Sequence, residues 1–200
     1  MAQDTPRQIG PWSVRSAQER YSNPWIRIEH SEVVHPDGSD GIYGVVRFAN
    51  VAVGVLPVFE DGSVLLVGQH RFPLDRYSWE LPEGGGPIGA DPLVSAKREL
   101  LEETGYEAAN WLPLIDFDVS NSVTDEVSSC FLAYGLTPGN AEPEPSEELA
   151  LKCVPFAELF AMCLDGRVRD SLTLVMALTA QARAQRGELP DALARHLICA

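Results

Sequence analysis

The sequence predicts an α+β fold built around one mixed or antiparallel β-sheet. Runs typical of strands come first, one amphipathic helix lies near the middle of the chain, and further strands and helices follow it. The chain has 200 residues, of which 45% are hydrophobic, so it can bury one substantial core. Two independent full-size domains would be cramped in this length. We therefore expect one globular unit.

The N-terminal third predicts an arm followed by hairpins. Residues 1–24 are polar and contain three prolines, so we expect an arm rather than a packed element. β-rich runs at 25–34 and 42–59 flank a turn-prone segment and predict a hairpin. Asp61 and Gly62 stand between two apolar runs and predict a second hairpin.

The next elements are a glycine-rich loop and a helix with clear ends. Residues 77–90 carry the run "EGGGPIG" and are expected to form the loop. Asp91 suits the N-cap, Pro92 the first helical position and Gly105 a left-handed stop. This pattern predicts a helix between Asp91 and Gly105.

The rest of the chain mixes strands and helices. Predicted strands cover 111–119, 126–136 and 149–156, and predicted helices cover about 156–164, 170–185 and part of 190–199. Residues 137–148 are acidic and proline-rich and are expected to form an exposed loop.

Charge and composition exclude several classes of function. The formal net charge is -14, which disfavours a broad grip on phosphate backbones, so we expect no polymeric nucleic acid as partner. A small anionic ligand stays possible if an arginine or a metal ion supplies positive charge. The four cysteines form no C-x-x-C pair, which indicates reduced thiols. The N-terminus has no secretory h-region and no apolar run is long enough to span a membrane, so we expect no membrane contact and a cytoplasmic protein.

The predicted helix places three carboxylates together near its C-terminal end. Glu99, Glu102 and Glu103 border an apolar arc of roughly 160°, because positions i, i+3 and i+4 share a face. Each like-charged pair costs about 0.2–0.5 kcal/mol, and the helix dipole adds to that cost. Arg98 can pair with Glu102 at i,i+4, but one arginine does not neutralise three acids. Mg²⁺ or Mn²⁺ would, since both prefer oxygen ligands; a solvated acidic face is the alternative, and spacing alone leaves both open.

At these residues the sequence resembles the Nudix family. "RELLEETGY" at 98–106 matches the core of the Nudix box, with Gly84 at its first glycine. Ala90 stands where the family usually has glutamate, and Asp91 is offset from that position by one residue. "QHRFPLDRYSWELPEGG" at 69–85 is similar to the segment before the box in ADP-ribose and nucleotide-sugar pyrophosphatases, where W-E-L-P-A-G is typical. The similarity covers roughly residues 25–185.

This resemblance implies an architecture. It implies a Nudix-type α/β/α sandwich with a mixed β-sheet, preceded by an N-terminal β-hairpin region. Residues 1–50 would form an arm and a β-rich dimerisation segment, and residues 51–200 the Nudix hydrolase domain, within a single globular unit. A homodimer is expected.

The resemblance also implies an activity, a Mg²⁺-dependent pyrophosphohydrolase acting on ADP-ribose or a nucleotide sugar such as GDP-mannose, with Mn²⁺ as a possible substitute. The implied metal ligands are Glu99, Glu102, Glu103 and a backbone carbonyl near Gly84. Arg98 would orient the carboxylates, and Arg71 would meet substrate phosphate. Glu80 would bind substrate or support the site, and the alternative is a purely structural, buried and hydrogen-bonded acid. Trp25 would stack on the nucleobase, with Trp12 a weaker candidate. The general base would lie on the acidic loop, where Glu144, Glu147 and Glu148 are available and Glu147 is favoured.

Other readings find less support in the sequence. "GGGPIG" satisfies G-x-G-x-x-G, but no regular βαβ unit surrounds it. The four histidines are dispersed and no G-x-S-x-G elbow occurs, so a serine-hydrolase site is not indicated. A second hypothesis remains beside the enzyme: a catalytically weak Nudix-like module that binds a nucleotide and regulates, which Ala90 makes plausible.

Overall fold

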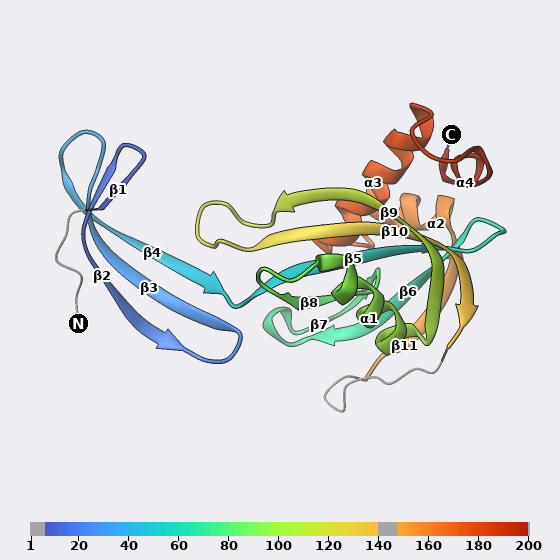
Figure 1. The fold of residues 1–200 in the computed structure, drawn as a ribbon, viewed down its shortest axis with the longest axis horizontal. Helices are drawn as coiled ribbons and strands as arrows, with labels where there is room; N and C mark the ends of the chain where they lie inside the picture. The colour runs from blue at the N-terminus through green and yellow to red at the C-terminus, as the bar shows by residue number, and fades with distance from the viewer. Residues whose placement is uncertain (1–6, 140–147, 200) are drawn as a thin grey trace. The chain divides into compact units, whose positions relative to one another are not determined.

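The computed structural model describes residues 7–139 and 148–199, and the chain divides into two compact units (Figure 1). One unit comprises Met1–Val51 with Asp118–Val127, and the other comprises Ala52–Phe117 with Ser128–Ala200. The predicted α+β class with a mixed sheet and a preceding β-hairpin region is confirmed. The longest helix in the described part of the chain has 15 residues, and none is both long and apolar enough to cross a membrane.

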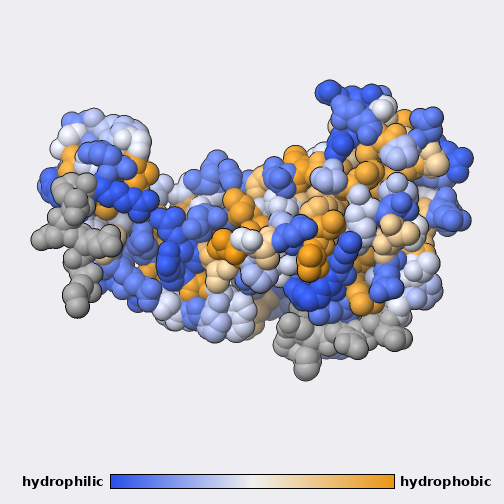
Figure 2. Space-filling model, in the orientation of Figure 1, coloured by the Kyte–Doolittle hydropathy of each residue, from blue (hydrophilic) through white to orange (hydrophobic). Residues whose placement is uncertain are grey.

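The N-terminal unit is a four-stranded antiparallel sheet in the order β1-β2-β3-β4. Its strands are β1 (Arg7–Ile9), β2 (Trp12–Ser22), β3 (Ile26–Val34) and β4 (Asp40–Phe48). The predicted hairpin between β3 and β4 is confirmed. The arm predicted for residues 1–24 is wrong from residue 7 onward. The polar residues of β2 are the exposed side chains of a strand in a solvent-facing sheet. Much of the face over β2 and β3 is hydrophilic (Figure 2).

Two sets of contacts hold this sheet together. The Trp12 ring packs edge-on against the Tyr43 ring, with 5.5 Å between centroids. Residues 118–127 return to β4: the Tyr43 hydroxyl donates to the Ser122 carbonyl at 2.7 Å, and the Val46 amide donates to the Val123 carbonyl at 2.8 Å. The second part of this unit is therefore joined to the first by backbone and side-chain hydrogen bonds.

The other unit is built on a mixed sheet of seven strands. The order is β11-β6-β5-β10-β9, with β7 paired to β6 and β8 paired to β5. The strands are β5 (Asn50–Val58), β6 (Ser63–Arg71), β7 (Arg76–Glu80), β8 (Glu83–Pro87), β9 (Tyr106–Asp118), β10 (Val127–Pro138) and β11 (Ala150–Pro155). β10 runs parallel to β5, whereas β6 runs antiparallel to it. The predicted hairpin at Asp61-Gly62 joins β5 to β6 and is confirmed.

A short 3₁₀ turn, η1 (Phe72–Leu74), links β6 to β7, and four helices complete the unit: α1 (Pro92–Thr104), α2 (Phe156–Asp165), α3 (Ser171–Gln185) and α4 (Asp191–Leu197). The predicted caps of α1 are confirmed, since the Asp91 side chain accepts from the Leu93 amide at 3.0 Å and Gly105 has φ +72°. Leu100 of α1 is fully buried, whereas the apolar side chain of Val94 is 66% exposed. Lys97 lies over the Trp111 ring, 5.9 Å from its centroid.

Alternation along β5 explains why helices cover both faces of the sheet. Val53 and Val55 of β5 lie on the face that packs against Leu100 of α1. Gly54, between them, faces the other way, and a Cβ there would come within 2.8 Å of the Met176 side chain of α3. α1 and α3 therefore lie on opposite faces, which gives the predicted α/β/α sandwich (Figure 1).

The glycine-rich segment is a strand, not the predicted loop. β8 contains Gly84, Gly85 and Gly86 and lies close under α1. A Cβ on Gly84 would overlap the Glu99 carboxylate, and a Cβ on Gly86 would overlap the Ser95 hydroxyl. The glycines thus let the helix approach the strand closely enough for helix side chains to reach the strand backbone.

Candidate active site

The three glutamates of α1 do not form a simple solvated face. Glu99 is 9% exposed and Glu103 is 6% exposed. The Glu99 Oε1 accepts a hydrogen bond from the Gly85 amide at 3.1 Å, and the Glu103 Oε2 accepts one from the Glu83 amide at 3.1 Å. Backbone N–H groups of β8 therefore offset part of the repulsion that the sequence implied.

Arg98 ties this cluster together. Its guanidinium contacts Glu102, which confirms the predicted i,i+4 pair. It also donates to the Glu99 Oε1 at 2.5 Å and to the Gly85 carbonyl at 2.9 Å. One arginine thereby fixes the positions of two carboxylates and of the strand that they face.

Burial and charge act in opposite directions on Glu99. Burial raises the pKa of the Glu99 carboxyl, while Arg98 and the Gly85 amide oppose the rise, and the net effect is upward. Burial lowers the pKa of Arg98, but the charges of Glu99 and Glu102 outweigh it and raise that pKa overall. Burial is therefore the main cause of the upward shift at Glu99, and the two neighbouring carboxylates are the cause of the shift at Arg98.

The donor chemistry of this cluster fits a hard divalent cation. Buried carboxylate oxygens of Glu99 and Glu103 converge on the β8 backbone, where the absence of a side chain on Gly84 leaves room for the Glu99 carboxylate. An all-oxygen donor set of this kind suits Mg²⁺ or Mn²⁺ better than zinc. We call Arg98, Glu99, Glu102 and Glu103 the box cluster.

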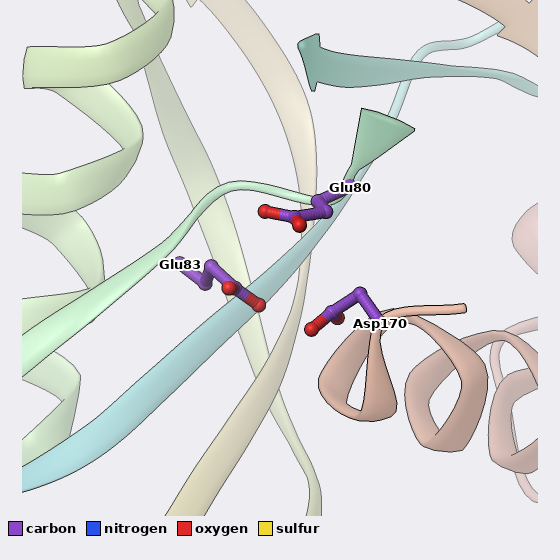
Figure 3. Close-up of side chains that lie close together, drawn as sticks. All are labelled: Glu80, Glu83 and Asp170. Atoms are coloured by element: carbon purple, nitrogen blue, oxygen red, sulfur yellow. The ribbon is translucent and has the colours of Figure 1, made fainter. Parts of the chain in front are cut away.

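A second acidic cluster lies at the ends of β6, β7 and β8 and the start of α3. Arg71 donates through Nε to Glu80 at 2.9 Å, and through Nη2 to Glu80 at 2.5 Å and to Glu83. The side chain of Asp170, the N-cap of α3, faces that of Glu83 (Figure 3). We call Arg71, Glu80, Glu83 and Asp170 the sheet-end cluster.

Glu83 connects the two clusters. Its amide binds Glu103 of the box cluster, and its side chain binds Arg71 of the sheet-end cluster. Burial and then the charge of Asp170 raise the pKa of the Glu83 carboxyl well above its ordinary value, with Arg71 opposing. Burial lowers the pKa of Arg71, but Glu80 and Glu83 more than offset it, so that pKa rises.

Sequence reasoning missed Glu83 and Asp170 as site residues. A signal existed for Glu83, since it stands where the resembled segment W-E-L-P-A-G has alanine. Asp170 carried a local signal only, as a helix N-cap whose side chain accepts from the Thr173 amide at 2.7 Å. Nothing in the sequence places it beside Glu83, because 87 positions separate the two residues.

The remaining predicted site residues lie elsewhere or outside the described residues. Trp25 belongs to the N-terminal unit, where it is 66% exposed. Glu144 and Glu147 lie outside the described residues, so the predicted base stays a prediction, and Glu148 is exposed. Trp12, the weaker stacking candidate, packs inside its own sheet.

Comparisons with known proteins identify the family of this chain. A model of the NUDIX domain matches residues 49–174, and a model of the nucleoside diphosphate sugar hydrolase N-terminal domain matches residues 12–46. An ADP-ribose pyrophosphatase of Mycobacterium tuberculosis is 32% identical over 84% of this chain and 82% of its own length. A methanol dehydrogenase activator of Bacillus methanolicus is 30% identical over 79% of this chain and 86% of its own length.

Two further relatives extend the comparison. An ADP-sugar pyrophosphatase of Mus musculus is 31% identical over 72% of this chain and 71% of its own length. The crystal structure of an ADP compounds hydrolase shares the fold, with a TM-score of 0.79, 17% identity, and coverage of 92% of this chain and 100% of that chain. The NUDIX domain model spans more than half of the sequence, and it includes both acidic clusters up to Asp170. The chain is therefore a member of the Nudix family, and it is a Nudix hydrolase.

Proposed function

We propose that this protein is a Mg²⁺-dependent pyrophosphohydrolase that cleaves the diphosphate of ADP-ribose or of a nucleotide sugar such as GDP-mannose. Water adds to one phosphorus, the P–O–P bridge breaks, and a nucleoside monophosphate and a sugar phosphate leave. The observation that carries the proposal is the buried pair Glu99 and Glu103, held against the β8 backbone beside Arg98. Relatives named ADP-ribose pyrophosphatase and GDP-mannose pyrophosphatase support the substrate class.

Glu99 and Glu103 would hold the metal, with Glu102 as a further ligand and a backbone carbonyl near Gly84 completing the set. Mg²⁺ bound there would neutralise charge on the diphosphate and lower the pKa of a bound water. Arg98 would act as a positioning residue, because it fixes Glu99 and Glu102 and the Gly85 carbonyl at once.

Arg71 would present its guanidinium to the substrate phosphate. Its side chain is 34% exposed, whereas that of Glu80 is 4% exposed. The two hydrogen bonds from Nε and Nη2 to Glu80 orient the planar fork, and bidentate forks match phosphate oxygens well. Of the two roles foreseen for Glu80, support of Arg71 is therefore the one we propose.

The other roles carry over from the sequence as proposals. Glu147 would be the general base and Trp25 would stack on the nucleobase. Residues 1–50 would mediate a homodimer and residues 51–200 would carry the hydrolase, in the cytoplasm. The match of residues 12–46 to the N-terminal domain of nucleoside diphosphate sugar hydrolases supports the assignment of the first segment to a recurring module.

The test is a panel of diphosphate substrates with identified products. The full chain is incubated with ADP-ribose or GDP-mannose and Mg²⁺, and products are resolved by ion-exchange chromatography and mass spectrometry. We expect AMP and ribose 5-phosphate from ADP-ribose, and no product when EDTA replaces Mg²⁺. Intact substrates across the panel, with a folded protein and Mn²⁺ also tried, would refute the proposal.

A second candidate is a nucleotide-binding regulatory module with weak catalysis. Two observations favour it: Ala90 replaces the usual glutamate of the box, and one relative is named a methanol dehydrogenase activator. The same panel separates the candidates if binding is measured in parallel by calorimetry. Saturable binding of ADP-ribose without product formation would support the module and exclude the enzyme.

A further inference from the structure

The sheet-end cluster concentrates negative charge that one arginine does not balance. One carboxylate oxygen from each of Glu80, Glu83 and Asp170 lies within 4.8 Å of the others (Figure 3). Arg71 is the cation in hydrogen-bond contact with Glu80 and Glu83. The three acids come from the end of β7, the start of β8 and the N-cap of α3, so the fold converges them.

A separate observation points to a missing ligand at this place. The Oε2 atom of Glu83 is buried and has no hydrogen-bond partner among the described residues. The other oxygen of this carboxylate, Oε1, is bound by Arg71. The Glu83 and Asp170 carboxylates point toward each other in Figure 3, so the carboxylate that carries the unpartnered oxygen belongs to this group of acids. Buried carboxylate oxygens ordinarily have a donor or a cation beside them.

We propose that Glu80, Glu83 and Asp170 bind a hard divalent cation, at a site separate from the box cluster. Oxygens on opposite sides of a bound Ca²⁺ are about 4.6–5.2 Å apart, and those of Mg²⁺ are about 4.0–4.2 Å apart. A spread of no more than 4.8 Å therefore lies within the range that oxygen ligands of one Ca²⁺ ion span. Ca²⁺ takes about six to eight oxygen ligands, and water would supply those that the carboxylates do not.

Cation binding at this site has a consequence for Arg71. A divalent ion between the carboxylates would replace the guanidinium as the counter-charge of Glu83, so the Nη2 hydrogen that Glu83 accepts would become available to an anion, while Nε and Nη2 stay bound to Glu80. The site would thus link ion binding at the sheet end to an arginine beside the box cluster.

Calorimetry with CaCl₂ on the full chain tests the site without any substrate. The titrated protein is the Glu99→Gln, Glu103→Gln double variant. The two substitutions remove the carboxylate ligands of the box cluster and keep the size and shape of the side chains. We expect one Ca²⁺ to bind this variant. Adding Glu83→Gln should weaken that binding at least tenfold, and so should Asp170→Asn, which keeps an N-cap on α3. The matched control is Asp165→Asn, which removes an exposed carboxylate at the end of α2 and should leave the affinity unchanged.

Two results would overturn the proposal. One is the absence of Ca²⁺ binding to the variant lacking the box ligands, when circular dichroism shows it to be folded. The other is Ca²⁺ binding that neither Glu83→Gln nor Asp170→Asn weakens. If the box variant does not fold, the wild-type chain and its Glu83→Gln variant are compared, and equal Ca²⁺ stoichiometry counts against the site. A failure of ADP-ribose hydrolysis would leave all of these readouts unaffected.

Discussion

The box cluster and the sheet-end cluster pair one arginine with several acids in contrasting ways. In the box cluster, Arg98 and its acids come from a single helix, and backbone amides of β8 also donate hydrogen bonds to two of the acids. In the sheet-end cluster, Arg71 and its acids come from three strands and a helix N-terminus, and an oxygen of Glu83 has no partner among the described residues. Backbone donors support the first cluster, and Arg71 with the Thr173 amide supports the second.

The difference shows how local and distant acids are stabilised. The spacing of residues on a helix face is enough to bring acids together. A glycine-rich strand can then lie close to that face and donate its backbone N–H groups to the acids. Acids that the tertiary structure brings together, as in the sheet-end cluster, rely on their arginine for positive charge. Removing this arginine leaves buried carboxylates without a positive counter-charge. The clusters should therefore respond differently to substitution.

The largest effect is expected for Glu103→Gln in the box cluster. The amide keeps the size of the side chain but removes a charged ligand, so turnover of ADP-ribose should fall by about 1,000-fold, the upper range for loss of one group that stabilises charge in a transition state. AMP release measures the rate, and circular dichroism checks the fold. Glu107→Gln, at an exposed position of β9, is the matched control and should keep full activity. Equal rates in both variants would contradict the assignment of Glu103 as a ligand.

The next effect is expected for Arg71→Met in the sheet-end cluster. Glu80 and Glu83 lose their cation while they stay buried, so the free energy of unfolding should drop by about 3 kcal/mol, the low end for a broken buried pair, since Arg71 is one-third exposed. Urea denaturation in EDTA measures it. Arg98→Met should cost less than about 1 kcal/mol, because Arg98 is more exposed and its partner Glu99 keeps the Gly85 amide as a donor. Similar losses in the two variants would remove the contrast between the clusters.

The smallest effect is expected for Arg98→Lys. A lysine ammonium cannot reach Glu99, Glu102 and the Gly85 carbonyl together, so Mn²⁺ affinity at the box cluster should weaken by about tenfold. Calorimetry with MnCl₂ gives the affinity. Arg167→Lys is the control, because Arg167 also bridges two acids but lies outside both clusters. A variant with unchanged affinity would show that Arg98 does not position the carboxylates.

The predictions from sequence succeeded where local signals are strong. The caps Asp91 and Gly105 fix α1 at both ends, and the Asp61-Gly62 turn fixes the hairpin of β5 and β6. They failed for residues 7–22, where polar residues form the solvated strands β1 and β2, and for the glycines of β8, which read as a loop. In both places strand pairing overrides the local preference of the residues.

The sequence by itself determined the acids of the box cluster and their arginine, because positions i, i+3 and i+4 of one helix share a face whatever surrounds it. Only the tertiary structure decided that Glu99 and Glu103 are buried against β8, and that Asp170 faces Glu83 across 87 positions of chain. The reason is that helical periodicity is a property of the backbone, while the meeting of β7, β8 and α3 follows from the packing of α3 on the sheet.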